Sequence, residues 1–325
     1  MSAARSMSEA RGGDDLGVSV GIDIGGTKTA AAAVYPDGSL AGRIDAPTPA
    51  HEGAAAVLDC AAGLAERVSS ELGIVPVGFG IGSAGAFDTV GRVVHATDHL
   101  AGWTGTDVAG YLRDRFGAPA VAVNDVHAAA LGELWSGPVQ RARFLFVAIG
   151  TGIGGAVVSS ARVLHGRSGL AGSVGHVSIS SAHRRVCSCG GVNHVEAFAS
   201  GPGIERTYLD FTGDRLGLRD IGRLAAGGDI VAAQVIRVAA EDLGESLAAS
   251  VTLLDPGEIV LGGGVSGLGD LFLAPIVESL RSSLRAPFDE VAVSIARLGP
   301  DAAIVGAGGL ASRIAAGAAA ADHFV

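Results

Sequence analysis

The chain has 325 residues, of which 48% are hydrophobic and 17% charged, so it is a folded globular protein and not a disordered one. A formal net charge of −10 without any lysine or arginine run argues against a nucleic-acid-binding surface. Three cysteines, two of them in a Cys-x-Cys, do not form a disulfide framework, and we expect a cytoplasmic protein.

The N-terminal part predicts a leader followed by strands and one helix. Residues 1–16 are polar, lack the apolar segment of a secretory signal and are expected to be disordered. The apolar run Val18–Ile24 ends in Gly-Gly and predicts a buried strand, with Thr29–Tyr35 as its hairpin partner. Gly53–Leu72 has the apolar spacing of an amphipathic helix with one buried face.

The middle of the chain continues with strands. Val75–Ile81 and Ala120–Val123 predict buried strands, and the second leads into Asn124-Asp125 and a helix over Val126–Trp135. The uncharged run Phe144–Ala161 is interrupted by glycines. It therefore predicts two strands, Phe144–Ile149 and Gly155–Val158, joined by a glycine turn, and not a membrane span.

The C-terminal part predicts a long helix over Ile230–Leu254, strands at Glu258–Leu261 and Val291–Ala296, and a closing helix at about 303–317. Strands that alternate with helices indicate an α/β protein. A glycine turn between two strands occurs around 21–35 and again around 147–158, which suggests a duplicated unit.

Two glycine-rich turns can bind phosphate. The first is Asp23-Ile24-Gly25-Gly26-Thr27-Lys28, in which glycines let the backbone approach a phosphate and an acidic side chain can hold Mg²⁺. It lacks the Walker A spacing, and an ordinary hairpin turn is an equal alternative for this element alone. The second is Gly150-Thr151-Gly152-Ile153-Gly154-Gly155, again between strands.

A third glycine cluster, Gly262-Gly263-Gly264, follows an apolar strand. Ligands of α/β sheets bind at the carboxyl ends of strands, so the three clusters together predict nucleotide binding.

These segments resemble the ROK family of bacterial sugar kinases and sugar-responsive repressors. The resemblance runs from about Val18 to about Ala316. It is carried by the two Gly-Thr turns, by Asn124-Asp125 before an alanine-rich helix, by Gly175-His176 and by Cys187-x-Cys189-Gly190.

The resemblance implies an actin/hexokinase-like (ribonuclease H-like) α/β fold with two domains around a cleft. We expect a small domain at 17–125, completed by the C-terminal helix, and a large domain at 126–302 that contains a zinc loop at 176–196.

The family implies that Asp125 is the catalytic base, with ATP, Mg²⁺ and a hexose as the other participants. A sugar hydroxyl is a poor nucleophile, so a carboxylate must orient it and accept its proton during phosphoryl transfer. Asn124 can offer both a donor and an acceptor to the sugar. Taken alone, Asn-Asp is equally an N-cap of the following helix.

A zinc site is implied at His176, Cys187, Cys189 and His194. His194 stands where the family has a third cysteine, and histidine is a competent zinc ligand, so a structural Cys2His2 site is expected. The alternative is loss of the metal, which would leave a free Cys-x-Cys pair.

The family further implies that Glu196 and His176 contact the sugar, with Gly85 nearby. Ser173 replaces a sugar-binding glutamate, and His99 and His127 stand where the family has asparagines. A site built to pair hydroxyls discriminates sharply when one partner changes, so a modified hexose such as an aminohexose is expected over plain glucose.

Two other functions compete with a sugar 6-kinase: a sugar-responsive regulator without its DNA-binding domain, and a non-catalytic sugar sensor. The roughly 20 residues before the first turn are too few for a helix-turn-helix domain. Asp125 and both phosphate turns favour the enzyme. By resemblance, a homodimer is expected, with no nucleic-acid or membrane partner.

Overall fold

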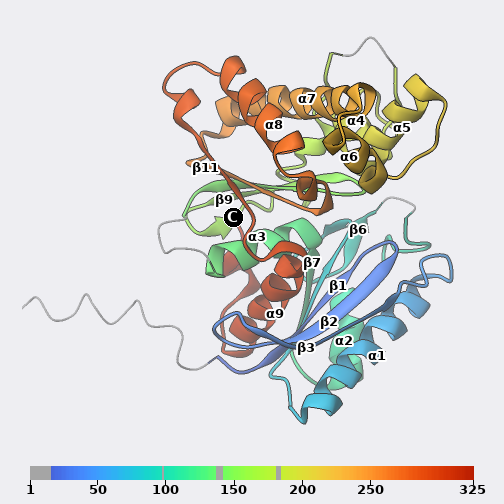
Figure 1. Cartoon of the computed structure of the whole chain (residues 1–325). Helices are drawn as coiled ribbons and strands as arrows, with labels where there is room; N and C mark the ends of the chain where they lie inside the picture. The colour runs from blue at the N-terminus through green and yellow to red at the C-terminus, as the bar shows by residue number, and fades with distance from the viewer. Residues whose placement is uncertain (1–15, 97–98, 137–141, 181–183) are drawn as a thin grey trace, which may run out of the picture. The chain divides into compact units, whose positions relative to one another are not determined.

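The computed structural model describes residues 16–96, 99–136, 142–180 and 184–325, so the leader expected at 1–16 lies almost wholly outside the described residues. The chain divides into two compact units (Figure 1). The first comprises the chain up to Ser136 together with Asp301–Val325, and the second is Gly137–Pro300. The division falls after Ser136, whereas the sequence placed the domain boundary after Asp125.

The first unit is built on a five-stranded sheet in the order β3-β2-β1-β4-β7, in which β1, β4 and β7 are parallel and β2 is antiparallel to both its neighbours. Its elements are β1 (Ser19–Ile24), β2 (Lys28–Val34), β3 (Leu40–Pro47), α1 (Ala54–Leu72), β4 (Phe79–Ser83), β5 (Ala86–Phe87), β6 (Val93–His95), α2 (Val108–Phe116), β7 (Ala120–Asn124), α3 (Asp125–Ser136) and α9 (Ala302–Ala315).

Glycines let α9 lie directly on this sheet. A side chain at Gly21 of β1 would lie 2.1 Å from the carbonyl oxygen of Ile304, and one at Gly80 of β4 would lie 1.9 Å from that of Ala307. The opposite face of β1 presents apolar residues such as Ile22 to α1 and α2, and these side chains form the core of the unit. Close helix-on-sheet contact therefore accounts for part of the high glycine content.

The second unit repeats this sheet. Its order is β10-β9-β8-β11-β12, with β8, β11 and β12 parallel and β9 antiparallel to both its neighbours. Its elements are β8 (Phe144–Ile149), β9 (Ile153–Ser159), β10 (Arg162–Val163), α4 (Glu196–Ala199), α5 (Gly201–Thr212), α6 (Leu218–Ala226), α7 (Ile230–Leu254), β11 (Glu258–Gly262), α8 (Asp270–Ser283) and β12 (Ala292–Ile295). The two matching sheets support the duplication indicated by the sequence.

Some elements differ from the sequence prediction. The strand expected from Val75 begins at Phe79 because Val75 is 93% exposed in the preceding loop. Helix α7 has the predicted bounds, but Val231 and Val238 lie on its exposed side, and alanines such as Ala239 form much of its buried face. Among the described residues no helix is long and apolar enough to cross a membrane.

Candidate functional site

Two aspartates meet at the carboxyl edge of the first sheet. Asp23 lies near the end of β1, and Asp125 begins α3 directly after β7. Between these two strands lies β4, where Gly82 pairs with Asp23 and lacks a side chain that would fill the space beside Asp125. Parallel strands that end at one edge thus bring together two carboxylates that are 102 positions apart in a 325-residue chain.

The pKa values of both carboxyl groups are raised. Burial and then the charge of Asp125 raise the pKa of Asp23 to about 7, against the lowering effect of Lys28 and Arg43. Burial also raises the pKa of Asp125, although the backbone N–H of Val126 opposes this shift. Both residues are half-buried. A raised pKa brings a carboxylate toward the range in which a general base works at neutral pH.

Asn124 fixes the start of α3. Its Oδ1 accepts the backbone N–H groups of Val126 at 3.0 Å and His127 at 3.1 Å, while its Nδ2 donates to the carbonyl of Gly85 at 3.0 Å. These contacts make Asn124 a helix cap, the alternative considered from the sequence. Because the cap immediately precedes Asp125, it also fixes the backbone from which the carboxylate projects.

The first glycine turn is stabilised by hydrogen bonds to its backbone carbonyls. The N–H of Gly25 donates to the carbonyl of Lys28 at 3.0 Å, and Gly26, Thr27 and Lys28 are exposed. Thr48 supports the turn: its hydroxyl donates to the carbonyl of Gly25 at 2.7 Å, and its N–H donates to that of Thr27 at 3.1 Å. Thr48 directly follows β3, and no sequence motif marks it.

The other two glycine clusters lie together in the second unit. The turn 150–152 joins β8 to β9, and the N–H of Gly201, the first residue of α5, donates to the carbonyl of Gly150 at 2.9 Å. Gly263 has φ +88°, and a side chain there would lie 2.3 Å from the carbonyl oxygen of Ile149 at the end of β8. The carboxyl ends of β8 and β11 therefore form one glycine-lined edge, with Thr151 exposed and Gly154 beside it.

The four predicted metal ligands converge in the second unit. One nitrogen or sulfur atom from each of His176, Cys187, Cys189 and His194 lies within 4.8 Å of the others. The Sγ–Nδ1 distances are 3.7 Å from Cys187 to His176 and 3.2 Å from Cys189 to His194. A tetrahedral Zn²⁺ with bonds of about 2.0–2.3 Å separates its ligand atoms by roughly 3.3–3.8 Å. The donor set is one that Zn²⁺ accepts, and these two distances are close to that range.

Glu196 connects this cluster to the second glycine turn. It begins α4, and its Oε2 accepts the N–H of Ile153 at 2.9 Å. Its Oε1 accepts the hydroxyl of Ser188 at 2.6 Å and the Sγ–H of Cys187 at 3.2 Å. Burial and the nearby Glu196 carboxylate raise the pKa of the Cys187 thiol to about 12. Ser188, which no sequence motif marks, therefore helps to orient Glu196, the residue predicted to contact the sugar.

Three residues at departures from the family pattern have distinct surroundings. The hydroxyl of Ser173 donates to the carbonyl of Leu170 at 2.6 Å within its own loop. His99 is exposed, and its Cβ lies 3.8 Å from where a side chain at Gly26 would begin. His127 is buried on α3, with its ring centroid 6.4 Å from that of Phe324 in the C-terminal segment.

Comparisons with known proteins identify the family. The sequence model of the ROK family matches residues 19–314. A glucokinase of Halalkalibacterium halodurans is 32% identical over 315 residues, which cover 90% of this chain and 94% of the relative. An N-acetylmannosamine kinase of Escherichia coli is 34% identical over 292 residues, which cover 89% of this chain and 97% of the relative.

The structures agree with the sequences. A ROK family glucokinase from Streptomyces griseus, solved in complex with glucose and AMPPNP, superposes with a TM-score of 0.81 and 30% identity, over 91% of this chain and all of the other. A ROK hexokinase from Thermus thermophilus gives a TM-score of 0.79 at 32% identity over 93% of this chain. The fold is of the actin/hexokinase-like class, as expected from the resemblance. The chain belongs to the ROK family, and within it to the ATP-dependent sugar kinases.

Proposed function

We propose that this sugar kinase transfers the γ-phosphoryl group of ATP to the 6-hydroxyl of a hexose or aminohexose, with Asp125 as the general base. The observation that carries the proposal is the position of Asp125. This half-buried residue stands at the edge where the parallel strands end, near Asp23, and burial raises the pKa of its carboxyl group. A carboxylate with these properties can accept a proton from a hydroxyl at neutral pH.

In the proposed reaction, Asp125 accepts the proton of the 6-hydroxyl as its oxygen bonds to the γ-phosphorus. The bond between that phosphorus and the β–γ bridging oxygen breaks, and ADP leaves. Asn124 holds the first turn of α3, so the carboxylate meets the hydroxyl from a fixed backbone. Positioning of this kind is a large part of catalysis in phosphoryl transfer.

Phosphate binding is assigned to the glycine clusters. In the first unit, Gly25, Gly26, Thr27 and Lys28 offer exposed backbone and side-chain donors. In the second unit, the edge formed by residues 150–154 and 262–264 is proposed to offer donors to phosphate in the same way. Asp23 would hold Mg²⁺, directly or through water; when bound, this cation neutralises phosphate charge.

The cluster of His176, Cys187, Cys189 and His194 is proposed to hold a structural Zn²⁺, because the four donors fit a tetrahedral ion. All four positions come from the protein, so the site would be closed and its role would be to order the loop next to Glu196. Glu196 and His176 are proposed to contact the sugar, as the family resemblance implies.

The substrate is proposed to be a modified hexose such as an aminohexose. Ser173 stands where the family has a sugar-binding glutamate, and its hydroxyl is engaged by Leu170. Loss of one hydrogen-bonding partner changes which hydroxyls or amides the pocket selects. We also propose a cytoplasmic homodimer, which light scattering of the purified protein would test. The sensor and regulator alternatives are not favoured.

A coupled ADP-release screen tests the function. Glucose, mannose, glucosamine, N-acetylated aminohexoses and 3-aminoglucose would be compared with saturating ATP and Mg²⁺. The variant Asp125→Asn is expected to lower kcat by about 10²–10⁴-fold on the best sugar, since the base is lost. Binding of a non-hydrolysable ATP analogue should remain. Turnover by Asp125→Asn near the wild-type rate would remove the base assignment, and inactivity of the wild type on every sugar would remove the proposed function.

A further inference from the structure

Arg185 closes the neck of the loop that carries three of the four proposed metal ligands. We call residues 185–194 the cysteine loop. The N–H of Arg185 donates to Oδ1 of Asn193 at 2.9 Å, and the N–H of Asn193 donates back to the carbonyl of Arg185 at 2.8 Å. An antiparallel bridge between Val186 and Val192 follows. The loop therefore leaves and returns at one point, where Arg185 stands.

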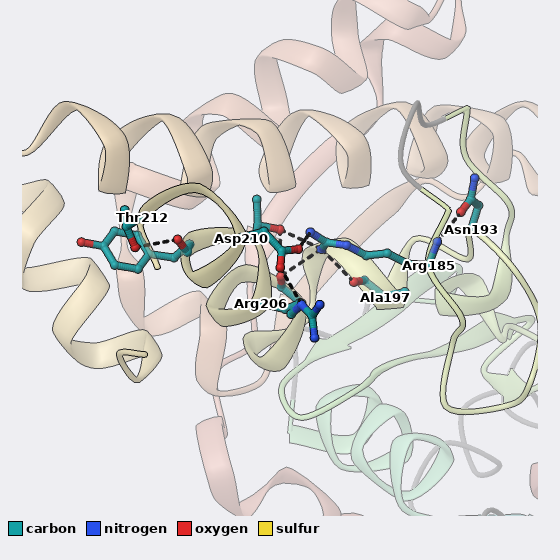
Figure 2. A network of polar contacts seen from close by, with 9 residues as sticks. Arg185, Asn193, Ala197, Arg206, Asp210 and Thr212 are labelled. Atoms are coloured by element: carbon teal, nitrogen blue, oxygen red, sulfur yellow. Dashed lines mark hydrogen bonds and ion pairs between the residues drawn. The ribbon is translucent and has the colours of Figure 1, made fainter. Parts of the chain in front are cut away.

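The side chain of Arg185 reaches from this neck to helix α5 (Figure 2). Its Nη1 donates to Oγ1 of Thr207 at 2.8 Å, and Nη2 pairs with Oδ2 of Asp210 at 3.1 Å. Longer contacts of 3.4 and 3.3 Å join Nη1 to the carbonyls of Ala197 and Gly203. One guanidinium thus contacts α4, the start of α5 and the middle of α5.

Burial makes this contact specific. The Arg185 side chain is only 14% exposed, and its guanidinium lies 4.8 Å from the centroid of the Phe198 ring on α4. Arg206 also pairs with Asp210, at 2.8 Å, but its side chain is 66% exposed and extends from α5 itself. A planar, buried guanidinium with several fixed acceptors holds two segments in register, which an exposed pair on one helix does not.

The anchored segments carry the proposed binding groups. Ala197 and Phe198 follow Glu196, whose carboxylate bonds to Ser188 of the cysteine loop and to Ile153 beside the second glycine turn. We infer that Arg185 is a positioning residue that fixes the cysteine loop to α4 and α5 and so sets where Glu196 meets the sugar. This inference rests on the proposed role of Glu196 as a sugar ligand.

Arg185→Met tests the inference, because it removes the guanidinium and keeps a long side chain. The KM for the sugar is expected to rise about 10- to 100-fold, since small displacements of a binding group have effects of that size. The KM for ATP should stay unchanged, as should kcat at saturating sugar. Arg185→Lys should recover part of the loss through its charge but not the planar contacts. Hydrogen exchange should become faster in peptides covering 184–199.

Arg206→Met is the matched control, because Arg206 is the second arginine that pairs with Asp210. This variant should leave the KM for the sugar unchanged. Equal effects of the two variants would overturn the inference, as would an unchanged sugar KM in Arg185→Met or a uniform loss with both substrates. If Arg185→Met does not fold, Asp210→Asn weakens the same anchor and should raise the sugar KM in the same direction.

The two proposals fail separately. If the wild type phosphorylates no sugar, the proposed function fails, and hydrogen exchange alone then decides the anchoring role. Faster exchange confined to the cysteine loop and α4 in Arg185→Met supports anchoring, and exchange that is unchanged or faster throughout the unit refutes it.

Discussion

Replacement of Asp23 by asparagine should make the ligand-free protein more stable above neutral pH while it removes kinase activity. Asp23 lies beside Asp125 in a partly buried site, and its pKa is raised from 3.8 to about 7. Between these two values the unfolded chain has released a proton that the folded chain retains. The free energy of unfolding of the wild type therefore falls as the pH rises through this window and levels off above about 7.

The size of the effect follows from the shift. A difference of about 3 pKa units, at about 1.4 kcal/mol each, gives a ceiling of about 4 kcal/mol. Asparagine has nearly the same shape as aspartate and cannot ionise, so the variant avoids the cost of a charged Asp23 in the folded protein. We expect Asp23→Asn to exceed the wild type by on the order of 2–4 kcal/mol at pH 8 and to approach it near pH 4.

Urea unfolding between pH 4 and 8, without nucleotide or divalent cation, measures this difference. Asp114→Asn, at an exposed aspartate on α2 of the same unit, is the control and should follow the wild type at every pH. A difference between Asp23→Asn and the wild type that does not change with pH would refute the electrostatic reasoning. In the kinase assay the same variant should lose activity, because Asp23 is the proposed Mg²⁺ ligand.

Two further predictions concern packing and metal. Gly80→Ala should lower the free energy of unfolding by at least about 1–3 kcal/mol, because the new methyl group would lie 1.9 Å from the carbonyl oxygen of Ala307. Gly63→Ala on α1 is the control and should not destabilise the protein, because the space beside Gly63 is open. Equal urea midpoints for the two variants would contradict this prediction. Metal analysis of the purified protein should find one zinc per chain. The zinc should be lost in Cys189→Ser and kept in His194→Cys, because zinc accepts both sulfur and nitrogen ligands. A wild-type protein without zinc would refute the site.

The sequence predicted the buried strands and long helices well. Strands β1, β7, β8 and β11 consist mainly of apolar residues, so their burial follows from composition. The edge strand β3 was missed because it is largely exposed and carries Arg43 and Asp45 within the strand. Helix α8 was missed as well; Pro275 lies inside it, where proline usually ends a helix.

The motifs located the site, but its supporting residues depend on tertiary contacts. Thr48 braces a turn 23 residues away, and Arg185 reaches Asp210 at a separation of 25. Neither residue type nor local spacing marks such a partner, because a threonine after a strand and an arginine beside a loop are common. The surroundings of His127 also depend on the fold, which buries it on α3 with its ring centroid 6.4 Å from that of Phe324 in the C-terminal segment.

The two matching sheets suggest how one scaffold acquired two tasks. Asp23 pairs with Gly82 on the neighbouring parallel strand, and the equivalent pair in the second unit is Ala148 with Gly262. The glycine is the same in both units, which keeps the space beside the strand end open, while the carboxylate occurs only in the first. Under the proposed mechanism, acid–base chemistry is thus confined to the first unit. In the same proposal, the edge of the second unit supplies backbone donors and Glu196, whose carboxylate accepts the N–H of Ile153 in β9. The chemistry of each unit was therefore set by a few side chains at strand ends, and the sheet itself could remain unchanged.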